Sequence, residues 1–162
     1  MPRLLRNVTF RINYTRAWSD SWLRQYSVTL DSIEYLSKPP YIIEHNTYNT
    51  GFRKGRLLTQ PDHILNTTFG YEIGGFSGMF TLSFQGRSLV GNARVEPNDR
   101  YVENFVRYDF SLRYRVGDHL SFLVSGVNIG NQPDISSLSG TSRHSTYDIY
   151  GAMYDFGIQY DF

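Results

Sequence analysis

The residues of this chain whose types could do chemistry are its histidines and its scattered acids and serines. The four histidines are His45, His63, His119 and His144. Metal and catalytic sites need several such groups close together. These histidines fall in separate predicted elements, and no spacing places two of them on one face. We therefore expect solvated histidines, no metal site and no cofactor.

The acids and serines give no catalytic pattern either. Asp155 and Asp161 share one face of the last alternating segment, whereas Asp148 lies on the opposite face. General acid–base catalysis needs groups that reach the same reacting atom, so a solvated polar face is the better interpretation. The serines near Gly140 lack a nucleophile elbow, and the glycines lack the spacing of a phosphate-binding loop. The sequence predicts that the protein is not an enzyme.

Composition excludes further classes. The chain has 162 residues, a net charge of +1, no cysteine and 16% aromatic residues, with a mean hydropathy of -0.40. This length suits one domain. No apolar run approaches the roughly 20 residues of a helical membrane span. The near-neutral charge argues against a nucleic-acid partner, and the lack of cysteine excludes disulfides and thiolate metal sites.

Alternation of apolar and polar residues predicts an all-β, antiparallel up-and-down meander of about six strands. The predicted strands cover residues 7–18, 63–72, 76–87, 102–116, 119–128 and 148–162. In the fifth, Leu120, Phe122 and Val124 compete with Leu123 and Val127, so its facing stays open. Residues 19–60 predict a long loop or a β-arm of two extended segments joined near Pro39 and Pro40.

Long and short connections alternate along the chain. Gly74-Gly75 and Gly117-Asp118 predict tight hairpin turns, whereas polar segments of about 14 and 18 residues precede the fourth and sixth strands. Transmembrane β-barrels have short periplasmic turns and long extracellular loops. If Phe162 lies at the periplasmic end, both tight turns fall there as well. The pattern therefore predicts strands from a transmembrane β-barrel.

The last segment carries a further motif. Its polar residue, glycine and two aromatic residues are Asp155, Gly157, Tyr160 and Phe162. Their order resembles the C-terminal signal of bacterial outer-membrane β-barrels, which the barrel-assembly machinery reads. The resemblance implies that these four residues are an assembly signal.

The order of residues along the whole chain resembles the C-terminal end of TonB-dependent receptors of Gram-negative bacteria. The resemblance rests on residues 60–77, on 108–112 with the Asn-x-x-Asn-x-Pro of 128–133, and on the last strand. It implies a bacterial outer-membrane location, a lipid environment and extracellular exposure of the loop or arm near residues 19–60. The intact receptor would take up a scarce solute of the siderophore, cobalamin or glycan class. The long loop resembles that of Bacteroidetes-type receptors.

The chain departs from this family in size. Such receptors resemble 22-stranded barrels with a plug domain and a TonB box, whereas about six strands and neither part are found here. An open sheet edge cannot sit in lipid, because each unpaired peptide group costs several kcal/mol. We expect residues 1–162 to be the C-terminal part of a barrel. Its partners would be the assembly machinery, the remainder of the barrel and plug, and the TonB complex through that plug.

Other interpretations stay open. Residues 1–6 lack the apolar region of a signal peptide, which fits a fragment of a longer product or a cytosolic protein. A soluble all-β ligand-binding module would bury the aromatic faces, and a small complete outer-membrane barrel would count the two arms as strands. The arginines that share the predicted lumen face, available to a plug or an anionic ligand, are Arg11, Arg87, Arg107, Arg113 and Arg115. Aromatic residues near strand ends that would form girdles include Tyr14, Trp18, Tyr71, Phe76, Tyr101 and Tyr160.

Overall fold

The computed structural model of the chain is an antiparallel β-protein. It describes residues 6–39, 41–93, 95–139 and 144–162, with 69% strand and 3% helix. The predicted all-β class is confirmed. Pro40, at the predicted join of the two arms, and Gly140, with the residues up to 143, lie outside the described part.

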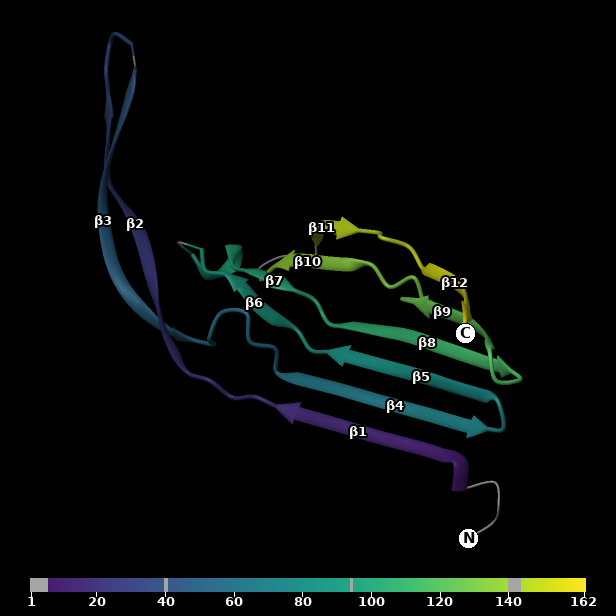
Figure 1. Cartoon of the computed structure of the whole chain (residues 1–162). Helices are drawn as coiled ribbons and strands as arrows, with labels where there is room; N and C mark the ends of the chain where they lie inside the picture. Colours follow the sequence, from purple (N-terminus) through teal and green to yellow (C-terminus); the bar gives the residue numbers. More distant parts are fainter. Residues whose placement is uncertain (1–5, 40, 94, 140–143) are drawn as a thin grey trace.

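The largest element is a six-stranded sheet with the order β1-β4-β5-β8-β9-β12, which is also the order of the chain. All five neighbouring pairs are antiparallel (Figure 1). Among the described strands, β1 and β12 form open edges and the sheet does not close on itself. The strands are β1 Val8–Arg16, β4 His63–Ile73, β5 Phe76–Gln85, β8 Phe105–Val116, β9 Leu120–Val127 and β12 Met153–Tyr160.

The two ends of this sheet differ. The β4–β5 and β8–β9 connections are tight turns, in which Gly74 and Gly117 take positive φ values of 55° and 65° that glycine adopts without strain. Both turns lie at the same end as the start of β1 and the end of β12, called the turn end here (Figure 1). The long connections gather at the opposite end, the loop end.

A long hairpin rises from the loop end (Figure 1). It pairs β2 Ser21–Tyr35 with β3 Ile42–Gly55. A register shift between Leu30 and Ser32 marks a bulge. Because directly opposed residues share a face, the bulge keeps Leu30 and Ile33 on one side. The exposed apolar residues of that side are Trp22, Tyr26, Val28, Leu30, Ile33, Tyr35, Ile42, Tyr48 and Phe52.

A second, four-stranded sheet with the order β11-β10-β7-β6 also lies at the loop end. It corrects the expectation of polar loops before the fourth and sixth strands. Its short strands continue strands of the large sheet along the chain, each after a short break. For example, β6 follows β5, and β11 precedes β12. Its strands are β6 Ser88–Gly91, β7 Arg100–Val102, β10 Asp134–Leu138 and β11 His144–Asp148, with a 3-10 helix η2 at Glu96–Asn98.

The breaks also correct two predicted strands. The segment 148–162 is not continuous, because Asp148 ends β11 and Gly151, with a φ of 81°, interrupts the chain before β12. The segment 102–116 divides in the same way, with Val102 in β7 and β8 starting at Phe105. The alternation of apolar and polar residues does not reveal such breaks, because the residues on both sides of a break are of types that are typical of strands.

The chain buries little apolar surface. Among the described residues, Leu23 and Leu89 are the buried hydrophobic side chains. Phe156 and Ile158, in contrast, are 80% and 73% exposed. Burial of apolar side chains is the main favourable term in folding. The apolar face of the sheet is therefore left without a covering by the part of the chain that the structure describes.

Candidate lipid-facing sheet and its polar face

The strand register assigns every side chain of the large sheet to one of two faces. Phe69, Phe80 and Phe110 oppose one another across β4, β5 and β8, and opposed residues of antiparallel strands share a face. The same pairing carries this face through β9 and β12. The resulting apolar face consists of Val8, Phe10, Ile12, Tyr14, Leu65, Phe69, Tyr71, Ile73, Phe76, Phe80, Leu82, Phe84, Val106, Tyr108, Phe110, Leu112, Tyr114, Val116, Leu120, Phe122, Val124, Tyr154, Phe156, Ile158 and Tyr160. It is interrupted by Thr67, Gly78 and Gly126, and it ends at the loop end with Arg16 and His63.

The pairing settles the facing of β9. Phe122 opposes Ile158 and Tyr114, so it belongs to the apolar face. Leu123 opposes Gly157 and Arg113, so it belongs to the other face. The register thus resolves a question that the sequence left open.

The opposite face is mainly polar. Arg11, Arg107, Arg113 and Arg115 lie on it, as predicted from their parity. Arg113 donates to Gln159 Oε1 at 3.1 Å. The remaining polar members include Thr9, Asn13, Thr15, Asn66, Thr68, Glu72, Ser77, Thr81, Ser83, Gln85, Asp109, Ser111, Ser121, Ser125, Asp155 and Gln159.

The prediction for Arg87 is wrong. This residue lies in the break between β5 and β6, outside the register of the large sheet. Its Nε lies 3.2 Å from Glu103 Oε1, and its guanidinium lies 3.9 Å above the Tyr101 ring. Tyr101 lies in β7 of the small sheet, beyond the ends of the large-sheet strands.

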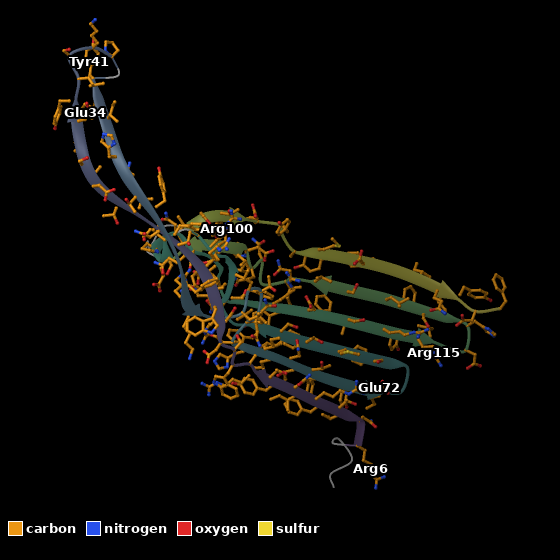
Figure 2. All side chains as sticks on the ribbon, turned by 90° about the vertical axis from the view of Figure 1, so that its left-hand side faces the viewer. Arg6, Glu34, Tyr41, Glu72, Arg100 and Arg115 are labelled. Carbon is orange, nitrogen blue, oxygen red and sulfur yellow. The ribbon has the colours of Figure 1, made fainter. Side chains whose placement is uncertain are left out.

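The other predicted girdle residues lie near the two ends of the sheet. Tyr14 and Trp18 lie at the loop end, where Tyr14 Oη is 2.7 Å from His63 Nδ1 and the Arg16 guanidinium is 4.6 Å from the Trp18 ring. Tyr71, Phe76 and Tyr160 lie at the turn end. Tyrosine and tryptophan favour membrane–water interfaces because one end of the ring is apolar and the other is polar. Figure 2 shows Glu72 and Arg115 at the turn end and Arg100 at the loop end.

The four residues of the expected assembly signal divide between the faces. Asp155 and Gly157 lie on the polar face, where Ser125 Oγ donates to Asp155 Oδ2 at 3.5 Å. Tyr160 lies on the apolar face, and its ring packs edge-on at 5.3 Å against the ring of the fully exposed Phe162. The motif thus forms the end of an edge strand.

The histidines do not come together. His45 lies on the hairpin 3.4 Å from Glu34, His63 contacts Tyr14, and the His119 ring lies 2.9 Å from a backbone oxygen of the last residues. The side chain of His144 lies outside the described part. Within that part, no group of three histidine, cysteine or acidic residues could hold a metal ion.

A buried polar network joins the hairpin to the small sheet. The Asp99 carboxylate has no exposed surface, forms an ion pair with Arg53 and accepts a 2.8 Å hydrogen bond from the Ala93 backbone. Arg53 also donates to Asn92 Oδ1 at 2.6 Å. Asn92 Nδ2 donates to the backbone oxygen of Arg24 at 3.0 Å. The sequence analysis missed this network, because Asp99 stands in a polar segment that resembles an ordinary loop.

Asn128 fixes the break between β9 and β10. It adopts a positive φ of 53°, and its backbone N–H donates to Asp109 Oδ1 at 2.8 Å. Its side-chain amide donates to the backbone oxygens of Gln132 and Gly151, both at 3.2 Å. The contact with Gly151 also holds the break before β12. Asparagine suits this position because it tolerates the left-handed conformation and bonds to nearby backbone.

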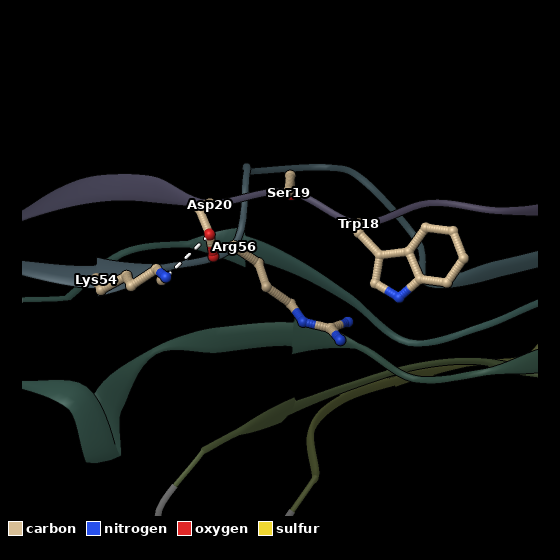
Figure 3. Close-up of a pocket in the computed structure, with 6 residues that line it drawn as sticks. Trp18, Ser19, Asp20, Lys54 and Arg56 are labelled. Atoms are coloured by element: carbon tan, nitrogen blue, oxygen red, sulfur yellow. Dashed lines mark ion pairs between the residues drawn. The ribbon is translucent and has the colours of Figure 1, made fainter.

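A hollow of about 630 Å³ lies at the base of the hairpin. Figure 3 shows Trp18 beside the hollow and Lys54 directed at Asp20. The Lys54 Nζ atom lies 2.9 Å from Asp20 Oδ2. Arg56 forms an ion pair with Asp62. The charges around this hollow therefore balance one another, and they leave no clear demand for a charged ligand.

Comparisons of the chain with protein-family models, with curated proteins and with solved structures find no match. No helix in the described part is long and apolar enough to span a membrane.

Proposed function

We propose that this chain is the C-terminal barrel segment of a TonB-dependent outer-membrane receptor, and that residues 1–162 supply barrel wall, external loops and the assembly signal. The intact receptor would take up a scarce solute with TonB-derived energy. The observation that carries the proposal is the apolar face of the large sheet, which extends over six strands and is left uncovered by the rest of the described chain. In the proposed receptor, lipid would cover this face.

The opposite face supports the same proposal. A barrel wall with a water-filled or plugged lumen alternates apolar outward residues with polar inward ones. In this sheet apolar residues predominate on one face of all six strands, and Arg16 lies at the loop-end margin of that face. The charged residues of the other face include Arg11, Arg107, Asp109, Arg113, Arg115 and Asp155. The receptor's plug would face that side.

The ends of the sheet support an orientation. Transmembrane barrels keep tight turns on the periplasmic side and long loops outside. The turn end would then face the periplasm. The hairpin and the four-stranded sheet would lie outside the cell, where solute arrives.

The soluble-module alternative fits the structure less well. It needs a sandwich in which the aromatic faces are internal, yet Tyr154, Phe156 and Ile158 are more than half exposed. The open edges at β1 and β12 favour a part of a larger barrel over a small complete one.

The test compares the purified chain in buffer and in detergent micelles by far-UV circular dichroism and gel filtration. We expect aggregation in buffer and β-structure only in detergent, with a polydisperse oligomer because the edges seek partners. A monodisperse β-rich monomer in buffer would overturn the membrane assignment. A discrete, heat-modifiable monomer in detergent would instead indicate a small complete barrel.

A further inference from the structure

A second hollow, of about 450 Å³, lies where the four-stranded sheet meets the polar face of the large sheet. Its volume is within the range of about 300–1,000 Å³ typical of small-ligand sites. It is lined by residues of β7, β8, β10 and β11. In the proposed receptor this position is the external mouth of the lumen.

Two aspartates that line this hollow stand opposite each other on neighbouring strands. Asp134 and Asp148 are direct cross-strand partners in β10 and β11. Like charges in such positions repel, and within the described residues neither side chain forms an ion pair. A positive group between them would remove the repulsion.

A metal ion fits this pair poorly. Calcium takes six to eight oxygen ligands, and the described residues offer no third acidic or histidine ligand here. An organic ammonium needs fewer partners, because its three hydrogen-bond donors match two carboxylates. The carboxylates therefore favour an ammonium group.

Cations line the same hollow. The Nε atom of Arg107 is buried and, among the described residues, has no hydrogen-bond partner. Its guanidinium lies 5.5 Å from the Phe105 ring, and Arg100 is likewise without an ion pair in the described part. A buried donor left unsatisfied is costly. A carboxylate would satisfy it, because guanidinium and carboxylate match as bidentate partners.

We propose that this hollow binds a small zwitterion, an amino acid or short peptide with free ends. Its ammonium would lie between Asp134 and Asp148, and its carboxylate would bind Arg107 and Arg100. Phe105 and Tyr150 also line the hollow and offer aromatic surface to the body of the ligand. This inference rests on the proposed function, for which it names the solute class.

The test uses the full chain folded in detergent and tri-alanine as the probe, with binding measured by titration calorimetry. N-acetylated tri-alanine, C-amidated tri-alanine and maltotriose are the comparison ligands. We expect each capped peptide to bind at least about tenfold more weakly, because the aspartates or the arginines of the hollow then lose their partner. Maltotriose is expected not to bind.

The variants test the residues directly. The double change Asp134→Asn and Asp148→Asn, and separately Arg107→Gln, should weaken tri-alanine binding at least about tenfold. Arg115→Gln, on the same face at the turn end, is the matched control and should bind normally. Circular dichroism checks that each variant folds. Equal binding of capped and free peptides, unchanged binding by both variants, preferred binding of maltotriose, or no binding by the folded chain would overturn the inference.

These outcomes are separable from a failure of the proposed function. A chain that folds as a monomer in buffer sinks the receptor assignment, and the same titrations in buffer still test the zwitterion site. A chain that folds only in detergent but ignores tri-alanine keeps the receptor assignment and loses this solute class.

Discussion

The six-stranded sheet and the loop end of the molecule are stabilised in opposite ways. The sheet directs its apolar side chains outward and leaves them exposed, so its stability depends on what surrounds it. The loop end instead buries Asp99 and Leu89 and ties its segments together with charged hydrogen bonds. The difference shows that one region of the chain leaves its apolar side chains to an outside partner, whereas the other is held together by its own polar contacts.

The largest expected effect tests the loop end. Asp99→Ala removes one partner of a buried ion pair and leaves Arg53, which is 14% exposed, without its carboxylate. Such a loss costs about 3–5 kcal/mol. We expect faster amide exchange in β7 and at the base of β3, measured in detergent by mass spectrometry. The control is Asp20→Ala at the same hairpin base, whose ion pair is exposed and worth about 0–1 kcal/mol. Equal protection in the two variants would contradict the role of the network.

The next prediction tests the wall. Phe80 and Met79 are neighbours on opposite faces near the middle of β5. Phe80→Arg places a charge on the apolar face and should cost about 2–4 kcal/mol in a bilayer or micelle. Met79→Arg is the matched control and should cost little, because it lies among polar residues. Urea unfolding in detergent measures both, and similar midpoints would show that the two faces are not distinct.

A smaller effect tests packing within the wall. Gly126 lies beneath the Phe110 ring, and an added Cβ would also lie 2.9 Å from Ile129 Cγ2. Gly126→Ala should destabilise the folded state by about 1–3 kcal/mol, because the ring must move. The unfolding midpoint in detergent measures it. Gly51→Ala on the hairpin, where nothing lies within 4 Å of the new Cβ, is the control.

The smallest stability effect belongs to the expected assembly signal. An added Cβ at Gly157 would meet Leu123 Cβ at 3.6 Å, an ordinary contact. Gly157→Ala should therefore change unfolding by no more than about 0.5 kcal/mol. If the motif is read during assembly, the same variant should insert more slowly into vesicles that contain the barrel-assembly machinery. Wild-type insertion rates would remove Gly157 from the signal.

Much of the wall could be predicted from the sequence, because its strands are long and their two faces differ in chemistry. The alternation of Tyr154, Phe156 and Ile158 with Asp155 and Gly157 defined the faces of β12 before the register did. The loop end was less accessible. Its strands are three to five residues long, too short for a period to stand out, and their register depends on distant partners such as Arg53 and Asp99.

The candidate site, like the fold, could be predicted from the sequence only in part. The sequence predicted that Arg107 lies on the polar face, but it did not predict which residues line the hollow beside it. Asp134 lay in a segment taken for a loop, and Asp148 was placed in the wrong strand. Only the pairing of β10 with β11 brings these two carboxylates together.

The bulge at Asp31 has a consequence for how the hairpin can change in length. Upstream of it the apolar residues of β2 stand at even positions, and beyond it Ile33 and Tyr35 stand at odd ones. Deleting Asp31 would remove the extra residue of the bulge and leave Leu30 and Ile33 two positions apart in a regular strand, so the apolar side of the arm would be unchanged. A single-residue insertion or deletion elsewhere in β2 would instead turn the residues beyond it to the opposite side of the arm, while paired ones would alter only its reach.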